Sequence, residues 1–274
     1  MTTTLRPIEP LQHAADGTRS RRFQVCVNSR PVGLIHLETT SSYGNEVARI
    51  RKLQIEEPDR RRGRGTVAAL AAEEVARGWG CGRMEVAVPA EAEAALRAAT
   101  ALGYLPRARA MGKALGATPP QLPAGSRSRA MTPAEFDVWQ EHEKEAYAQS
   151  WISRGVPEAE ARAKAQKDHE IFLPDGAATE GMTLSVLEHE GTRVGTLWVG
   201  AREGHAFVYD VETDEAHRGH GHGRSLMLLA EAQAVAGGWT GIRLNVFAGN
   251  TPAERLYESL GYETITHHLY KDLQ

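Results

Sequence analysis

The sequence predicts an α/β protein that contains two copies of one layered domain. Two observations support this prediction: strand-like and helical segments follow one another along the chain, and four short landmarks occur twice in the same order. The offset between the copies is 158 to 162 residues throughout. The paired landmarks are Val32–Ile35 with Val194–Leu197, Arg60–Gly65 with Arg218–Gly223, Gly78–Trp79 with Gly238–Trp239, and Gly103–Tyr104 with Gly261–Tyr262.

A Pro/Gly-rich stretch without apolar periodicity separates the copies at residues 116–126, as is typical of a linker. We therefore expect one domain at residues 1–115 and another at residues 127–274. The first copy is abbreviated, because its strand pair around Asn28–Pro31 starts by about residue 22 and leaves no room for two leading helices.

The second copy is expected to begin with two helices. Thr132 is a candidate N-cap, Pro133 suits the first turn, and Glu135 lies three residues after the cap, which together form the pattern of a capping box. A further helix is expected from Pro157 to about Phe172. The aromatic residues Trp139, Tyr147 and Trp151 lie on the first of these helices, and we expect at least two of them to serve amphipathic packing.

An antiparallel meander should follow, then an alternation of helices and strands. Glu190-Gly191 is a hairpin turn signal between two strand-like runs. The expected elements are strands at 183–188, 193–199 and 206–213, a helix at 225–236, a strand at 241–247, a helix that starts at Asn250–Glu254 and ends at Gly261, and a strand at 262–270.

Composition excludes several classes of protein. Hydrophobic content of 41% and charged content of 24% are those of a globular protein. No apolar run is long enough to cross a bilayer and the N-terminus lacks a signal-peptide core, so we expect a cytoplasmic protein that does not bind membranes. Cys26 and Cys81 fit no metal or redox spacing, and we expect buried, inert thiols.

The net charge of −3 is unevenly distributed. Residues 1–125 carry 18 Lys/Arg and 12 Asp/Glu, whereas the remainder carries 14 and 23. The arginines of the basic part are scattered apart from Arg60–Arg64 and have no aromatic partners, so we expect no nucleic-acid partner. The acidic part favours a cationic substrate such as an amine.

The stretch from His217 to Ser225 is the most informative motif. It lies between a predicted strand and a predicted helix, where backbone N–H groups converge on a phosphate-binding position. A metal site at His217, His220 and His222 is the competing interpretation, but the interleaved glycines and the lack of a carboxylate or cysteine partner favour phosphate. A dinucleotide fingerprint should open the first βαβ unit of a chain, whereas this turn follows a meander.

This turn, together with Asn245–Asn250 and Arg255–Tyr262, resembles the GNAT (Gcn5-related N-acetyltransferase) superfamily, whose acyl-CoA motif is Arg/Gln-x-x-Gly-x-Gly/Ala. The first copy resembles the same family more weakly. The resemblance implies two GNAT-like domains, each a mixed, mostly antiparallel sheet with flanking helices. It also implies acetyl-CoA as co-substrate and requires no metal.

By this resemblance, backbone and turn residues of the second copy would bind acetyl-CoA. They are Val211, Thr213, Arg218, Gly219, His220, Gly221, His222, Gly223, Arg224, Ser225 and Asn250. Tyr257 matches the position whose hydroxyl commonly protonates the CoA sulfur, although its ring could instead simply pack on the sheet. Asp210 and Glu212 lie two residues apart on one strand and face one side, so either is a candidate base, and we rank Glu212 first.

The first copy lacks these groups, with Ala99 opposite Tyr257 and Ala92 opposite Asn250. We therefore expect an inactive scaffold there and acetylation of a small-molecule primary amine in the second copy, by a monomer or homodimer. The alternatives are acetylation of a protein N-terminus or lysine, synthesis of a specialised thiol or antibiotic-type metabolite, and a non-catalytic acyl-CoA-binding protein.

Overall fold

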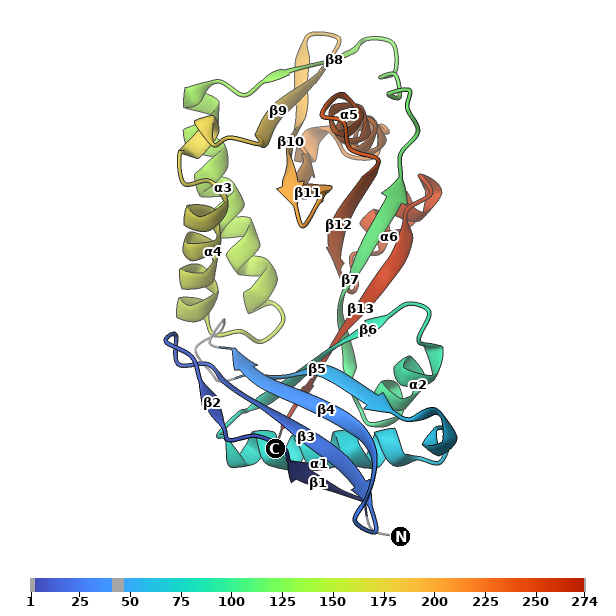
Figure 1. Ribbon diagram of the computed structural model, residues 1–274. Coiled ribbons are helices and arrows are strands. Elements are labelled where there is room, and N and C mark those ends of the chain that lie inside the picture. The colour runs from blue at the N-terminus through green and yellow to red at the C-terminus, as the bar shows by residue number, and fades with distance from the viewer. Residues whose placement is uncertain (1–2, 41–46, 274) are drawn as a thin grey trace. The chain divides into compact units, whose positions relative to one another are not determined.

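The computed structural model describes residues 3–40 and 47–273 (Figure 1). They form two compact units. Unit 1 contains the described residues up to Ala108 together with those from Thr266 onward, and unit 2 contains Arg109–Ile265. The units therefore differ from the two repeats in sequence: each takes in the end of a strand that belongs to the other repeat.

Unit 1 is a sheet with two helices and no helix among the described residues before its first strands, as the sequence predicts. Its strands are ordered β1-β3-β4-β5-β6-β13, antiparallel except for β5 and β6. Asn28 and Ser29 form the predicted turn with φ of 47° and 67°. The elements are β1 (Thr3–Pro7), β2 (Gln12–His13), β3 (Arg19–Val27), β4 (Arg30–Thr40), β5 (Val47–Ile55), the 3₁₀ turn η1 (Glu57–Asp59), α1 (Arg64–Gly78), β6 (Arg83–Pro89), α2 (Glu93–Ala101), the start of β7 (Leu105–Ala114) and the end of β13 (Glu263–Asp272).

Unit 2 has the strand order β7-β12-β11-β10-β9-β8. The strands β8 to β11 are antiparallel and β11 pairs with β12 in parallel, which confirms the mixed, mostly antiparallel sheet. Besides the rest of β7, its elements are β8 (Ser126–Ala130), α3 (Pro133–Ile152), α4 (Glu158–Phe172), η2 (Gly176–Ala178), β9 (Met182–His189), β10 (Thr192–Arg202), β11 (His205–Thr213), η3 (Glu215–His217), α5 (His222–Ala236), β12 (Gly241–Phe247), α6 (Thr251–Ser259) and the first residues of β13.

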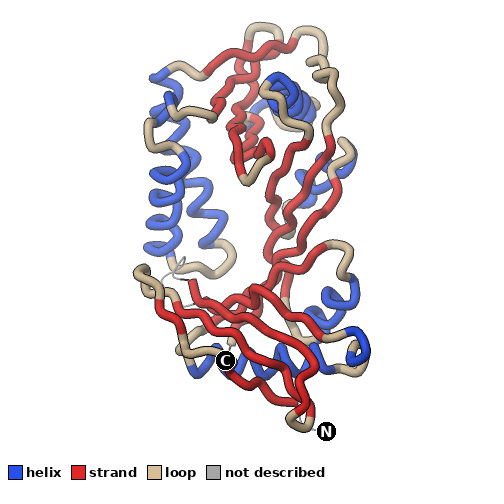
Figure 2. The backbone as a smooth tube through the Cα atoms, viewed as in Figure 1, coloured by secondary structure: helices blue, strands red, loops and turns tan. Residues whose placement is uncertain are grey.

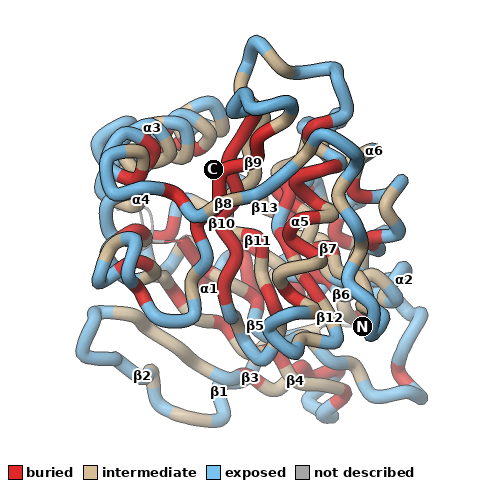
Figure 3. Tube along the Cα trace, turned by 90° about the horizontal axis from the view of Figure 1, so that it is seen from above, coloured by how far each residue is buried: buried red, intermediate tan, exposed pale blue. Residues whose placement is uncertain are grey.

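Helices cover both faces of the unit 2 sheet. The adjacent helices α3 and α4 (Figure 2) pack one face through a cluster that includes Phe136, Trp139 and Trp198. On the other face, Leu226 and Met227 of α5 lie in a second cluster with the sheet and with α6. The strands between these helices carry much of the buried chain in Figure 3. The outcome is a three-layer α/β/α domain.

Local signals set most of the element boundaries. Thr132 accepts a hydrogen bond from the Glu135 amide at 3.3 Å while the Glu135 side chain accepts from the Thr132 amide at 2.9 Å, which confirms the capping box. The helix α5 begins at His222, three residues before the predicted start, because Gly221 at φ 88° leads the chain directly into it. The predicted linker region has no helix or strand from residue 115 to 125, and its last residue, Ser126, begins the edge strand β8.

The strands β11 and β12 separate from each other after a short pairing. They pair only from Ala206 with Ile242 to Val208 with Leu244. Beyond that point a register shift opposite Trp198 and Val199 leaves Tyr209 as an extra residue, which is a β-bulge. The rest of β11 and the rest of β12 are therefore free of each other, and this opening is where the predicted site residues gather.

Candidate active site

The glycine turn of unit 2 has a backbone geometry that is suited to an anion. Gly219 and Gly221 have φ of 81° and 88°, a left-handed conformation that glycine adopts without strain. Gly221 caps α5, so the first amides of that helix point out of its N-terminus without intrahelical partners. Arg218 donates from Nε to the Thr213 carbonyl at 3.3 Å and so ties the turn to the end of β11.

Unit 1 repeats this turn, and there a residue of the turn itself takes part in an ion network. Arg60 donates from Nε to the Ile55 carbonyl at 2.8 Å, which is the counterpart of the Arg218 bond. The position of His222 is taken by Arg64, which is buried and paired with Asp59. Arg30 also binds Asp59, at 2.8 and 2.9 Å. The first copy therefore carries fixed opposite charges beneath its turn.

Asp210 lies on β11 beneath α3. Trp139 donates from Nε1 to its Oδ2 at 3.4 Å. The residue as a whole is half-buried, but the surrounding atoms enclose its carboxylate. This burial, followed by the charges of Glu143 and Glu212, raises the pKa of Asp210 to about 7. Such a carboxyl is well matched to accepting a proton near neutral pH.

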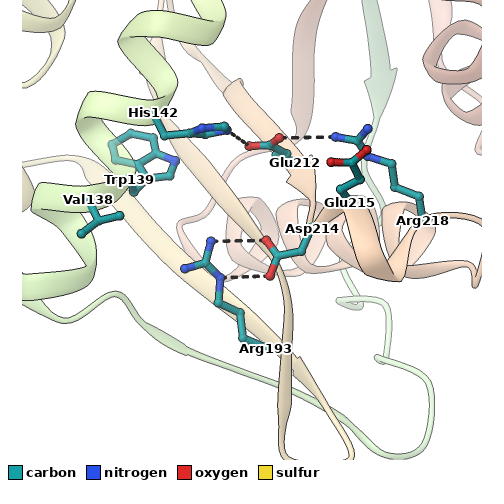
Figure 4. Close-up of a pocket in the computed structure, with 8 residues that line it drawn as sticks. All are labelled: Val138, Trp139, His142, Arg193, Glu212, Asp214, Glu215 and Arg218. Atoms are coloured by element: carbon teal, nitrogen blue, oxygen red, sulfur yellow. Dashed lines mark hydrogen bonds and ion pairs between the residues drawn. The ribbon is translucent and has the colours of Figure 1, made fainter.

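Glu212 faces the same side, but two neighbouring side chains hold its carboxylate. Its carboxylate contacts His142 Nε2 at 2.9 Å and the Arg218 guanidinium at 3.6 Å. The side chain is 33% exposed. It lines a pocket of about 350 Å³ at the α3 side of the turn, and Figure 4 shows these residues together with the pair of Arg193 and Asp214. The other lining residues are Val138, Trp139, His142, Glu215 and Arg218.

Tyr257 reaches the same region from α6. Its side chain is 6% exposed and packs in the cluster on the α5 side of the sheet. Burial, followed by the negative charge of Asp210, raises the pKa of Tyr257 to about 12. The hydroxyl is therefore protonated at neutral pH and is available as a proton donor.

The remaining predicted residues occupy defined positions around the turn. Asn250 is the N-cap of α6, and its side chain accepts from the Ala253 amide at 3.4 Å. Arg224 donates to the Ser259 hydroxyl at 2.6 Å, and Ser225 is buried in α5. His222 is buried beneath the turn, where burial and the neighbouring imidazoles of His189, His217 and His220 lower its pKa.

Several residues near the site were not predicted from the sequence to belong to it. Glu143 of α3 and His169 of α4 form an ion pair at 2.5 Å, and His142 holds Glu212. Their role depends on the packing of two helices against the sheet, which local patterns do not specify. The expected packing role of Trp139 and Trp151 is confirmed, since both are buried.

Three further observations concern metal ligands, thiols and membrane-spanning helices. Within residues 3–40 and 47–273 no group of three or more His, Cys, Asp and Glu side chains is arranged to hold a metal ion. Cys26 and Cys81 are buried and unbonded to each other. No helix in the described part of the chain is long and apolar enough to span a membrane.

The comparisons with known proteins place the chain among the N-acetyltransferases. The acetyltransferase (GNAT) family model matches residues 3–104 and 136–262, so the chain belongs to this family and contains two copies of its domain. The chain is 29% identical over 149 residues to the uncharacterized N-acetyltransferase YdgE of Bacillus subtilis, a match of 52% of this chain and 95% of that one. It is also 29% identical over 218 residues to a mycothiol acetyltransferase of Brachybacterium faecium, covering 74% of this chain and 62% of that one.

Solved structures agree on the fold. A GCN5-related N-acetyltransferase from Sphaerobacter thermophilus has a TM-score of 0.60 at 19% identity and covers 92% of this chain and 81% of that one. A tandem GNAT protein from the clavulanic acid biosynthesis pathway has a TM-score of 0.53 at 20% identity, with 96% and 85% covered. The tandem arrangement predicted from the repeats is thereby confirmed.

Proposed function

We propose that unit 2 transfers an acetyl group from acetyl-CoA to the primary amine of a small molecule, with Asp210 as general base and Tyr257 as general acid. The observation that supports this most directly is the pair of side chains at the opening between β11 and β12. One has a pKa of about 7 and the other a pKa of about 12. At neutral pH about half of the base is therefore ionised, and the acid is protonated.

The comparison with unit 1 supports the choice of catalytic copy. At the same offset of 158 residues, Lys52 stands where unit 2 has Asp210, and Ala99 stands where it has Tyr257. Lys52 is exposed and cationic, so it has no role in taking a proton from an ammonium. Unit 1 keeps the turn and lacks both proton-transfer groups.

The chemistry follows from these positions. Asp210 takes a proton from the bound ammonium, and the freed nitrogen lone pair attacks the thioester carbonyl carbon to form a C–N bond. Backbone N–H groups at the strand opening are suited to stabilise the resulting oxyanion. Collapse breaks the C–S bond, Tyr257 protonates the departing sulfur, and the second proton of the nitrogen returns to the tyrosine through water.

The acceptor class is inferred from charge and from the relatives. Asp210 provides a carboxyl group at the α3 face of the opening, which favours a cationic amine, whereas Glu143 is already paired with His169 and Glu212 with His142 and Arg218. Two relatives are named mycothiol acetyltransferases, and these names support a small-molecule acceptor.

We prefer Asp210 as the base to Glu212, which was ranked first from the sequence, because His142 and Arg218 already hold the Glu212 carboxylate.

The test is an acetyl-transfer assay with a panel of acceptors. The protein is mixed with acetyl-CoA and with small amines, amino sugars and peptides with free N-termini, and free thiol release is measured. We expect small amines to stimulate release, Asp210→Asn to reduce kcat at least about 100-fold and Glu212→Gln to reduce it only a few-fold. Release that no acceptor raises above hydrolysis, or a larger loss in E212Q than in D210N, contradicts the proposal.

A further inference from the structure

Each unit contains a buried glutamate on the helix that follows its glycine turn. Glu73 of α1 is 1% exposed and Glu231 of α5 is 4% exposed. The two residues are 158 apart and so occupy the same position of the two repeats. A buried carboxylate without a cation beside it would be strongly destabilising.

A lysine neutralises each glutamate, and a buried tyrosine lies against the pair. In unit 2, Lys113 Nζ lies 2.8 Å from both carboxylate oxygens of Glu231 and 5.7 Å from the ring centre of Tyr262. In unit 1, Lys271 Nζ lies 2.7 Å from Glu73 Oε2 and 5.7 Å from the ring centre of Tyr104. All three equivalent pairs keep the offset of 158 residues.

The lysines are exchanged between the repeats. Lys113 belongs to β7, the final strand of the first repeat, yet it neutralises a glutamate of the second repeat inside unit 2. Lys271 belongs to β13, the final strand of the second repeat, and neutralises a glutamate of the first inside unit 1. Neither repeat therefore contains the cation that its own buried glutamate uses.

We propose that the first repeat serves the acetyl-CoA site as a donor: its strand β7 supplies Lys113, a positioning residue that acts through Glu231 to hold α5, and with it the phosphate turn, in place. This inference rests on the proposed function in so far as that assigns acetyl-CoA to the unit 2 turn. It gives a physical role to a copy that has no proton-transfer groups of its own.

The test compares two matched variants of the full chain, Lys113→Met and Lys271→Met. Hydrogen exchange is followed in peptides that cover α1 and α5, and acetyl-CoA affinity is measured by calorimetry. We expect K113M to accelerate exchange in α5 by at least about tenfold and to raise the acetyl-CoA Kd by about tenfold, with α1 unchanged. K271M should loosen α1 instead and leave the Kd within about twofold.

The opposite effects expected of K113M and K271M distinguish the exchange of lysines between the repeats from a general loss of stability. If K113M leaves α5 and the Kd unchanged, or loosens α1 in place of α5, the inference is wrong. The double variant K113M/E231M removes both charges and should restore slow exchange in α5, because no unpaired carboxylate remains. Should K113M not fold, recovery of folded protein in the double variant supports the role of charge, and continued loss of the fold overturns it.

The hydrogen-exchange measurement does not depend on catalysis. If no amine is acetylated but the crossed exchange pattern holds, the proposed function fails while the donor role stands. A second measurement uses a protease site placed among residues 116–125, which form no helix or strand. After cleavage the two fragments should co-elute and still bind acetyl-CoA, since each unit holds a strand of the other fragment; separation into two folded proteins overturns the inference.

Discussion

Replacing Asp210 by asparagine should reduce kcat at least about 100-fold and, at alkaline pH, make the protein more stable. The substitution keeps the shape and an acceptor for the Trp139 indole N–H while it removes the ionisable proton. Asp210 has a folded-state pKa of about 7 against an unfolded value of 3.8. One pKa unit corresponds to about 1.4 kcal/mol, so the ionised carboxylate destabilises the fold by at most about 4 kcal/mol above pH 7.

The sign of this effect fixes its pH dependence. Because the pKa of Asp210 is raised on folding, the folded state binds the proton more tightly than the unfolded state. The corresponding stability is fully present below about pH 4 and is lost as the pH rises through about 7. Asp210→Asn should therefore match the wild type near pH 4 and exceed it by about 2 to 4 kcal/mol at pH 8.

Urea unfolding at pH 4, 6 and 8 measures this difference. Four of the five tryptophans, at positions 139, 151, 198 and 239, lie in unit 2, so tryptophan fluorescence reports mainly on that unit. Glu212→Gln is the matched control, and its stability relative to the wild type should not rise between pH 4 and pH 8. A D210N protein that is less stable than the wild type at pH 8, or a difference that does not grow with pH, refutes the burial argument and with it the assignment of the base.

Three further outcomes follow from the same geometry. Tyr257→Phe should lower kcat by about 10- to 100-fold with little change in the acetyl-CoA KM, measured as thiol release. The wild-type kcat should rise with pH to a plateau through an apparent pKa of about 7, and a profile flat from pH 5 to 9 contradicts Asp210 as base. Gly221→Ala forces a side chain into φ 88°, at a cost of about 1–2 kcal/mol, and should raise the acetyl-CoA Kd by about tenfold. The matched change Gly63→Ala, at φ 71° in unit 1, should leave that Kd unchanged.

The sequence predicted the repeat because backbone constraints impose the same residues twice. A Cβ on Gly33 would lie 2.2 Å from the Gln54 carbonyl oxygen, and one on Gly195 would lie 2.3 Å from that of Glu212. Both glycines therefore stand where two strands approach too closely for any side chain. Such local requirements leave a pattern that can be read along one chain, and the turns and caps were predicted for the same reason.

The sequence could not predict in this way that β7 and β13, the final strands of the two repeats, each extend into the unit of the other repeat. The strand β7 contains no β-branched or aromatic residue, and nothing in the residues of β7 or β13 indicates which unit they complete. Strand pairing over long sequence separations depends on the assembled sheet, and the lysines Lys113 and Lys271 acquire partners only there. The ranges 1–115 and 127–274 were predicted from the repeated landmarks alone, whereas the compact units divide the chain at residues 108 and 265.

The choice between Asp210 and Glu212 depended on the same kind of missing information. The two carboxylates share one face of one strand, and the ranking of Glu212 before Asp210 from the sequence used no information about what covers each of them. What separates them is the helix above: Trp139 covers Asp210, whereas His142, three residues further along α3, reaches Glu212 and contacts its carboxylate at 2.9 Å. Unit 1 has no leading helices among its described elements, and the position of Asp210 there is an exposed lysine. The raised pKa of the base thus comes from the helices that cover the strand, so a copy that keeps only the glycine turn has the phosphate-binding geometry without the means to make a base.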